Sequence, residues 1–106
     1  MQAISKIHES YNERLTVEQL AKIANLSRSA FVKRFTELCK IPPSEYIANR
    51  RIEAVEYMLK NTALSITDIA FESGFYDASH LNKLFIAKNG ISPNAFRKLH
   101  SSDGKK

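Results

Sequence analysis

The sequence predicts an all-α fold of seven helices, in which two helix-turn-helix subdomains are joined by a long connecting helix. Apolar residues recur with helical spacing in seven segments, none alternates as a strand would, and two helix pairs each surround a tight turn. We therefore assign residues 1–42 and 61–100 of the 106-residue chain to the two subdomains, 43–60 to the connecting helix and 101–106 to a flexible tail.

The clearest helix pair lies in the second subdomain. A short helix is predicted from Ser65, with a stop at Gly74, and a longer helix follows from Ala78. In a helix-turn-helix, the second helix is the one that enters a DNA major groove. The longer helix has an apolar stripe of Leu81, Leu84 and Phe85, and its other faces present Ser79, His80, Asn82 and Lys83.

The remaining helices follow from caps, prolines and apolar spacing. An amphipathic first helix contains Ile4 and Ile7 and ends near Asn12, and the segment Thr16 to Gln19 forms a capping box that starts the second. Ser27 caps a third helix through Cys39, with Phe31, Phe35 and Leu38 predicted on its buried side. Pro43 opens the connecting helix, about 25 Å long at about 1.5 Å per residue, and Pro93 opens a last helix through Leu99.

The chain repeats itself at an offset of about 50 residues, with one extra residue in the second turn. Such a match of apolar residues, a lysine and a proline indicates a duplicated helix-turn-helix. Two head-to-tail copies would read successive major grooves if their recognition helices lie about 34 Å apart. The matched pairs are Val17/Ile66, Leu20/Ile69, Ala21/Ala70, Leu26/Phe75, Ser29/Ser79, Phe31/Leu81, Lys33/Lys83, Phe35/Phe85, Ile41/Ile91, Pro43/Pro93 and Tyr46/Phe96.

Charge favours a polyanionic partner, since 16 Lys and Arg residues outnumber 11 Asp and Glu residues, for a net charge of +5. The second predicted recognition helix lies wholly in a window without a carboxylate, 78–102, and the first lies mostly in another, 19–36, which ends before Glu37. The single cysteine, Cys39, excludes an internal disulfide, and no run of about 18 apolar residues predicts a membrane span. We expect a soluble cytoplasmic protein, associated with the nucleoid when bound to DNA. No metal site, cofactor motif or catalytic constellation is visible, which predicts a non-enzyme.

The chain resembles the DNA-binding domain of the AraC/XylS family of bacterial transcription regulators from about Ile4 to Arg97. The resemblance implies a regulator, most often an activator, that binds double-stranded DNA specifically and has RNA polymerase as a protein partner. It also implies an effector-binding or dimerisation domain elsewhere, and the helix starting directly after Met1 favours a piece of a longer regulator over a stand-alone one. The carrying segments are LAKIANLSRSAFVKRF from Leu20, RRIEAVEYML from Arg50, ITDIAFESGFYDASHLNKLF from Ile66 and GISPNAFR from Gly90.

The sequence departs from the family pattern at four positions. Leu81 and Lys83 stand where the family usually has Phe and Arg, and Ile86 replaces a usual lysine. Lysine lacks the bidentate fork of arginine, so we expect looser base discrimination at Lys83. Lys40 replaces a usual glycine, which predicts a differently shaped end of the third helix.

Two sets of residues are candidate DNA contacts. Those matching the family's groove-facing positions are Ser29, Val32, Lys33, Ala78, Ser79, His80, Asn82 and Lys83. The candidates for phosphate contact, which positions a protein without reading sequence, are Arg28, Arg34, Arg50, Arg51, Arg97 and Lys98. For each, the competing interpretation is an ordinary solvated helix residue, and for Val32 it is a half-buried packing residue.

Two alternatives to specific DNA binding stay open. The first is a helical module that docks a protein by its basic face. The second, an RNA binder, is disfavoured because A-form major grooves are too narrow for a helix. The sequence does not give the operator, the regulated genes, the inducing signal or the sign of regulation.

Overall fold

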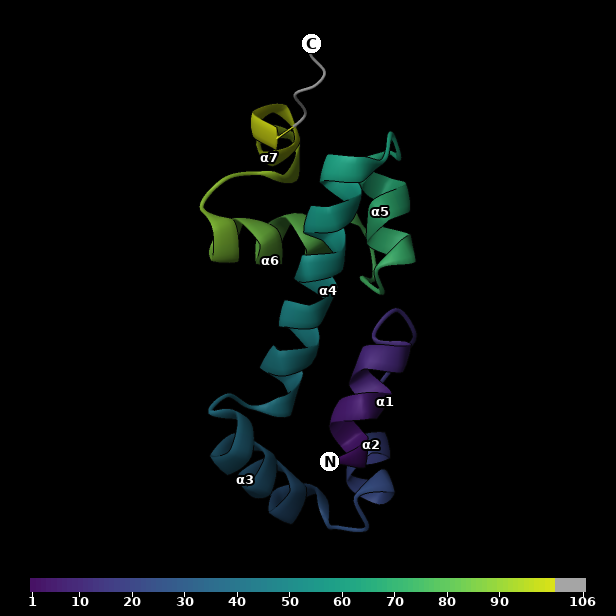
Figure 1. Cartoon of the computed structure of the whole chain (residues 1–106), viewed down its shortest axis with the longest axis vertical. Coiled ribbons are helices and arrows are strands. Elements are labelled where there is room, and N and C mark those ends of the chain that lie inside the picture. Colours follow the sequence, from purple (N-terminus) through teal and green to yellow (C-terminus); the bar gives the residue numbers. More distant parts are fainter. Residues whose placement is uncertain (101–106) are drawn as a thin grey trace. The chain divides into compact units, whose positions relative to one another are not determined.

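The structure, a computed structural model, describes residues 1–100, and the predicted flexible tail 101–106 lies outside the described residues. Over residues 1–100 the chain forms seven helices and no strand, which confirms the predicted all-α class (Figure 1). No helix within this range combines the length and apolar character that crossing a bilayer requires. The helices are α1 (Gln2–Ser10), α2 (Val17–Ile23), α3 (Arg28–Cys39), α4 (Pro43–Asn61), α5 (Ile66–Glu72), α6 (Ala78–Asn89) and α7 (Pro93–His100).

The chain forms two compact units, a first unit of Met1–Arg50 and a second unit from Arg51 onward. Helix α4 runs without a break from Pro43 to Asn61, so it contributes its first part to the first unit and the rest to the second. Each unit has its own apolar core. We call α2, α3 and the turn between them the first module, and α5, α6 and their turn the second module.

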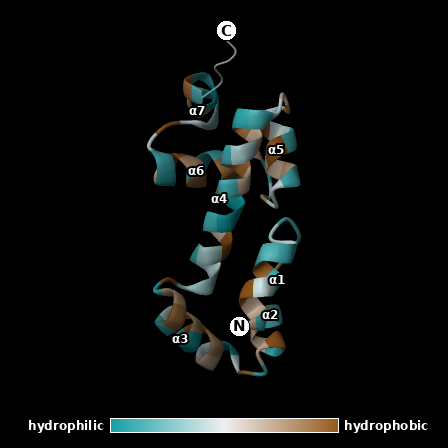
Figure 2. Ribbon diagram, viewed as in Figure 1, coloured by the Kyte–Doolittle hydropathy of each residue, from teal (hydrophilic) through white to brown (hydrophobic). Residues whose placement is uncertain are grey.

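The core of the first unit gathers apolar side chains from four helices. Ile7 of α1, Leu20 of α2, and Phe31 and Phe35 of α3 are all 0% exposed, and Ile47 of α4 packs with them. The rings of Phe31 and Phe35 lie 5.6 Å apart between centroids. Figure 2 shows hydrophobic and hydrophilic residues interleaved along α3, as expected for a helix with one buried side.

The core of the second unit repeats this arrangement with different residues. Ile69 of α5 and Leu81 and Phe85 of α6 are 0% exposed, and they cluster with Leu59 of α4. Phe96 of α7 meets Phe85 edge to face, with centroids 5.2 Å apart and rings 85° apart. Such an edge-to-face pair adds a small stabilisation beyond the buried area.

The ends of α3 and α6 have the same backbone shape. Lys40 ends α3 with φ 71°, and Gly90 ends α6 with φ 79°, both in the left-handed region. Each residue's amide donates a 2.8 Å hydrogen bond to a helix carbonyl, Thr36 for Lys40 and Ile86 for Gly90. The expectation that Lys40 reshapes the end of α3 was therefore wrong, because lysine here adopts the conformation that glycine adopts more easily.

One predicted core residue of α3 was also misplaced. Leu38, predicted on the buried side, is 58% exposed, whereas its neighbour Cys39 is half-buried. Leu38 has the right spacing from Phe31 and Phe35. It belongs to the last turn of α3, however, and spacing alone does not tell how far along a helix its packing partners reach.

Candidate nucleic-acid interface

The turns of the two modules close with the same hydrogen bonds. In the first, Asn25 takes φ 63° and the amide of Leu26 donates to the carbonyl of Ala21 over 2.9 Å. In the second, Gly74 takes φ 93° and the amide of Phe75 donates to Ala70, also over 2.9 Å. Both turns use a left-handed residue to end the first helix, a conformation to which glycine and asparagine are best suited.

A polar cap fixes the start of each second helix. The Ser27 hydroxyl accepts a 3.2 Å hydrogen bond from the amide of Ala30 at the start of α3. The Asp77 carboxylate accepts a 2.8 Å hydrogen bond from the amide of His80 at the start of α6. Each cap satisfies an amide that has no partner inside its helix. The caps therefore fix where the exposed faces of α3 and α6 begin.

The second turn is longer than the first by one residue, Tyr76, which follows Phe75 and precedes the cap Asp77. Tyr76 is 87% exposed, and Phe71 near the end of α5 is 77% exposed. The sequence indicated the extra residue, but not that two aromatic side chains next to this turn stand in solvent. Periodicity places neither of them, because Tyr76 is outside any helix and Phe71 lies on the outer side of a two-turn helix.

Helix α6 has one buried side and one exposed side. Leu81 and Phe85 are fully buried, while the candidate base-contacting residue Ala78 is half-buried. The ring of His80 meets the Phe75 ring edge to face, with centroids 5.4 Å apart, which limits the directions it takes. The other candidates on this helix are all exposed: Ser79, His80, Asn82 and Lys83.

Helix α3 has the same separation. Its candidates Ser29 and Lys33 are exposed, and so are the phosphate-contact candidates Arg28 and Arg34. Val32 is half-buried, which is compatible with either of its two interpretations. The structure thus places the candidates of each module together on one helix, in the first module on α3 and in the second on α6.

Three of the arginines proposed to contact phosphate have contacts within the protein. Arg97 donates from Nε to the carbonyl of Leu59 and from Nη2 to the carbonyl of Thr62, each over 3.2 Å. The Arg50 guanidinium lies 4.7 Å from the centroid of the Tyr11 ring. Burial lowers the pKa of the half-buried Arg51. The contacts of Arg97 and Arg50 were missed because their partners are far away in the sequence. The phosphate-contact role of all three arginines stays a prediction.

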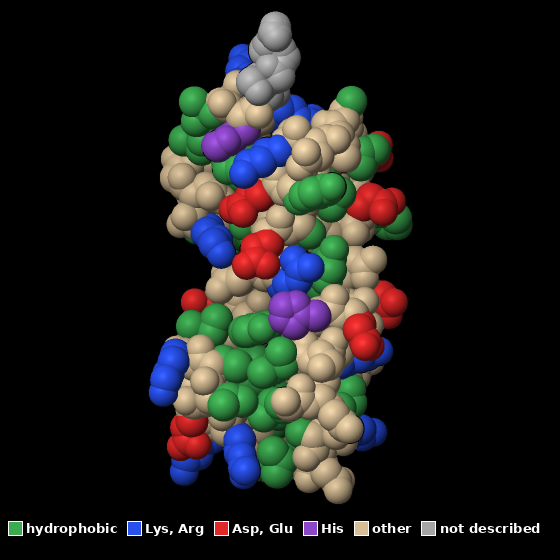
Figure 3. Space-filling model, in the orientation of Figure 1, with side chains coloured by type: hydrophobic (Ala, Val, Ile, Leu, Met, Phe, Trp, Pro, Cys, Tyr) green, Lys and Arg blue, Asp and Glu red, His purple; other side chains and the backbone are tan. Residues whose placement is uncertain are grey.

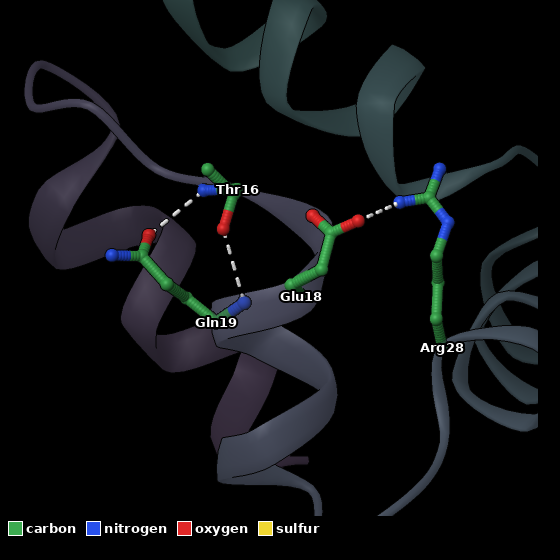
Figure 4. A network of polar contacts seen from close by, with 4 residues as sticks. All are labelled: Thr16, Glu18, Gln19 and Arg28. Atoms are coloured by element: carbon green, nitrogen blue, oxygen red, sulfur yellow. Dashed lines mark hydrogen bonds and ion pairs between the residues drawn. The ribbon is translucent and has the colours of Figure 1, made fainter.

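A fourth candidate, Arg28, is paired with Glu18 across the first module (Figure 4). The Glu18 carboxylate, at the start of α2, accepts a hydrogen bond from Nη1 of Arg28, the first residue of α3. On the other side of Glu18, Thr16 and Gln19 form the predicted capping box, with bonds of 3.1 Å and 2.8 Å. The structure confirms the capping box, whereas no sequence pattern indicates the ion pair.

Acidic and basic side chains are mixed on one face of the protein. On the face drawn in Figure 3, Lys and Arg side chains lie among Asp and Glu side chains. Within residues 1–100, no three His, Cys, Asp or Glu side chains are grouped so that they could hold a metal ion. The exposed candidate residues of α3 and α6 can therefore provide hydrogen bonds and positive charge to a partner.

Residues 20–99 match the family described as a helix-turn-helix domain, a range that covers the first module from Leu20 onward and the whole second module. This chain belongs to that family, the AraC-type helix-turn-helix proteins, which confirms the resemblance found in the sequence.

Relatives and solved structures agree with this assignment. The chain is 39% identical over 92 residues to the Msm operon regulatory protein of Streptococcus mutans, covering 87% of this chain and 33% of that protein. It is 30% identical over 103 residues to the lactose operon transcription activator of Staphylococcus xylosus, covering 97% of this chain and 37% of that protein. It thus spans about a third of the length of these relatives.

Among solved structures, the chain is similar to the DNA-binding domain of AdpA, a global transcriptional factor, in complex with a target DNA. The TM-score is 0.92 at 26% sequence identity, and the match covers 97% of this chain and 93% of the other. The likeness therefore includes both modules and the helices around them.

Proposed function

We propose that this chain is the sequence-specific, double-stranded DNA-binding part of a bacterial transcription regulator, with α3 and α6 as its recognition helices. The observation that carries the proposal is the exposed polar face of α6, which follows a closed helix-turn-helix turn while Leu81 and Phe85 anchor the opposite side. Family membership and the DNA-bound AdpA domain support it. A recognition helix reads bases with such exposed side chains.

Asn82, His80 and Lys83 are the residues of α6 that we propose to read base edges. Asparagine can bond adenine through two atoms, and lysine can donate to guanine. On α3 we assign this role to Ser29 and Lys33. The two modules would then read two segments of one long, non-palindromic site in successive major grooves.

We further propose that the whole regulator acts as an activator with RNA polymerase as its protein partner, and that an effector or dimerisation domain lies outside this chain. The name of the Staphylococcus xylosus relative supports the activator role. The proposed role is non-enzymatic, which agrees with relatives that are transcriptional regulators.

The test is selection of bound duplexes from a random pool, followed by binding measurements at several salt concentrations. We expect one preferred site, with affinity that falls steeply as salt rises because phosphate contacts release counterions. The alternative, a module that docks a protein, predicts no preference among duplex sequences. Recovery of unrelated sequences only would overturn the proposal.

Variants of two lysines on α6 separate base reading from charge. Lys83→Ala is expected to weaken the selected site by about 1 to 3 kcal/mol and to relax preference at one position. Lys88→Ala, which removes the same charge from an exposed position in the last turn, is the control. An equal loss on all duplexes for Lys83→Ala would assign this lysine to a phosphate contact.

Lys33→Ala, on α3, should relax the base preference in the other segment of the site, which tests whether both modules bind the DNA.

A further inference from the structure

The ion pair between Glu18 and Arg28 joins the two helices of the first module at an exposed place. The side chain of Arg28 is 58% exposed and that of Glu18 is 64% exposed. Solvent and salt screen such a pair, so it contributes little to stability. A role in folding therefore does not account for this pairing.

The second module lacks both partners. At the repeat offsets of 49 and 50 residues, Thr67 of α5 corresponds to Glu18 and Ala78 of α6 corresponds to Arg28. The two charged residues are thus both present in one module and both replaced by neutral residues in the other. Only the first module therefore has a positively charged residue, Arg28, at the first position of its recognition helix.

Arg28 is the first residue of α3, and N-terminal residues of a recognition helix lie next to the DNA. A guanidinium binds phosphate and carboxylate oxygens with the same N–H groups and in the same planar geometry. Nη1 of Arg28 already donates to the Glu18 carboxylate (Figure 4). A DNA phosphate that takes this same N–H group would have to replace that carboxylate, and the unpaired carboxylate would then remain close to the DNA.

On this basis, and resting on the proposed function, we propose that Glu18 competes with a DNA phosphate for Arg28 and so lowers the affinity of the first module for duplex DNA. Phosphate contacts carry no sequence information, so the effect applies to all duplexes alike. Glu18 thereby limits the affinity of the first module for DNA. The first module then depends more than the second on its base contacts for that affinity.

The experiment compares Glu18→Gln with Glu37→Gln, which removes the same charge from an exposed position of α3. Binding to the selected duplex and to a scrambled duplex is measured over a range of salt concentrations. Glu18→Gln is expected to raise affinity several-fold on both duplexes and to steepen the slope of log affinity against log salt by about 0.9, one extra phosphate contact. Glu37→Gln should leave that slope unchanged. Equal behaviour of the two variants would overturn the inference.

A second pair of variants tests whether the effect passes through Arg28. In an Arg28→Ala background, Glu18→Gln should no longer steepen the salt dependence, and persistence of the change would overturn the inference. Glu18→Thr, which installs the residue of the second module, should behave as Glu18→Gln does. Circular dichroism is used to check that each variant is folded. If the unmodified protein binds no duplex, the proposed function fails; if it binds and Glu18→Gln changes nothing, only this inference fails.

Discussion

The side chain of Arg97, in α7, reaches back to the end of α4, where its Nε donates a hydrogen bond to the main-chain carbonyl of Leu59 over 3.2 Å. A second nitrogen, Nη2, donates to the carbonyl of Thr62 just beyond the helix. The last carbonyls of a helix have no partner within it, so a guanidinium is well suited to satisfy them. Arg97 thus joins α7 to α4 inside the second unit.

We expect Arg97→Ala to destabilise the second unit by about 1.5 to 3 kcal/mol, the usual worth of a hydrogen bond to a charged group. The loss is measured as a shift in the urea midpoint of unfolding. Arg97→Lys should recover only part of it, because an ammonium does not span both carbonyls. Lys98→Ala, at the exposed neighbouring position, is the control. A loss no larger than that of the control would show that these bonds add no stability.

Leu81→Ala should cost about 2 to 5 kcal/mol, because it opens a cavity in a core that excludes water. Leu81 is 0% exposed and packs in the cluster of the second unit. Leu99→Ala removes the same atoms from a side chain that is 72% exposed and should change stability by no more than about 0.5 kcal/mol. Chemical denaturation measures both, and similar losses would contradict the assignment of Leu81 to the core.

Gly90→Ala should destabilise the protein by about 1 to 2 kcal/mol through backbone strain alone. A Cβ at Gly90 would meet no heavy atom within 4 Å, so no clash contributes, but its φ of 79° disfavours a side chain. Gly90→Asn should lose less, since asparagine tolerates this conformation. Lys40→Gly should stabilise by less than about 1 kcal/mol, because the greater freedom of glycine in the unfolded chain offsets the relieved strain. Thermal unfolding of the three variants checks the order, and a neutral Gly90→Ala would contradict it.

The Glu18 carboxyl should titrate below its ordinary pKa of 4.5 in the folded protein. Its own backbone hydrogen bond lowers the pKa most, burial opposes this, and the Arg28 charge lowers it further. The stabilisation from these contacts is present above about pH 4.5 and lost as pH falls through the folded pKa. NMR titration should show Arg28→Ala raising the pKa part of the way, with Arg34→Ala as the control. No change on loss of Arg28 would contradict the pairing.

The helices and their caps could be predicted because their signals are local. Thr16 and Gln19 lie three residues apart, and the cap Ser27 directly precedes α3. The duplication added a second copy of the same pattern, which fixed the corresponding helices of the second module. The capping residues Thr16, Gln19 and Ser27, whose partners lie three residues away, were therefore placed correctly.

Tertiary contacts were not predictable in the same way. Arg97 lies 38 residues from Leu59 and 35 from Thr62, and nothing in the local pattern marks it as a cap for α4. Arg28 and Glu18 meet only because α2 packs on α3. The candidate base contacts came from family resemblance, since recognition depends on another molecule that periodicity does not describe.

The matched turns have a consequence for how such a protein diversifies. Asn25 and Gly74, and likewise Lys40 and Gly90, hold equivalent bends with different chemistry. The backbone path at these bends is therefore compatible with more than one residue type. For the proposed function, this means that the exposed residues of α3 and α6 can vary while the bends around them keep their shape.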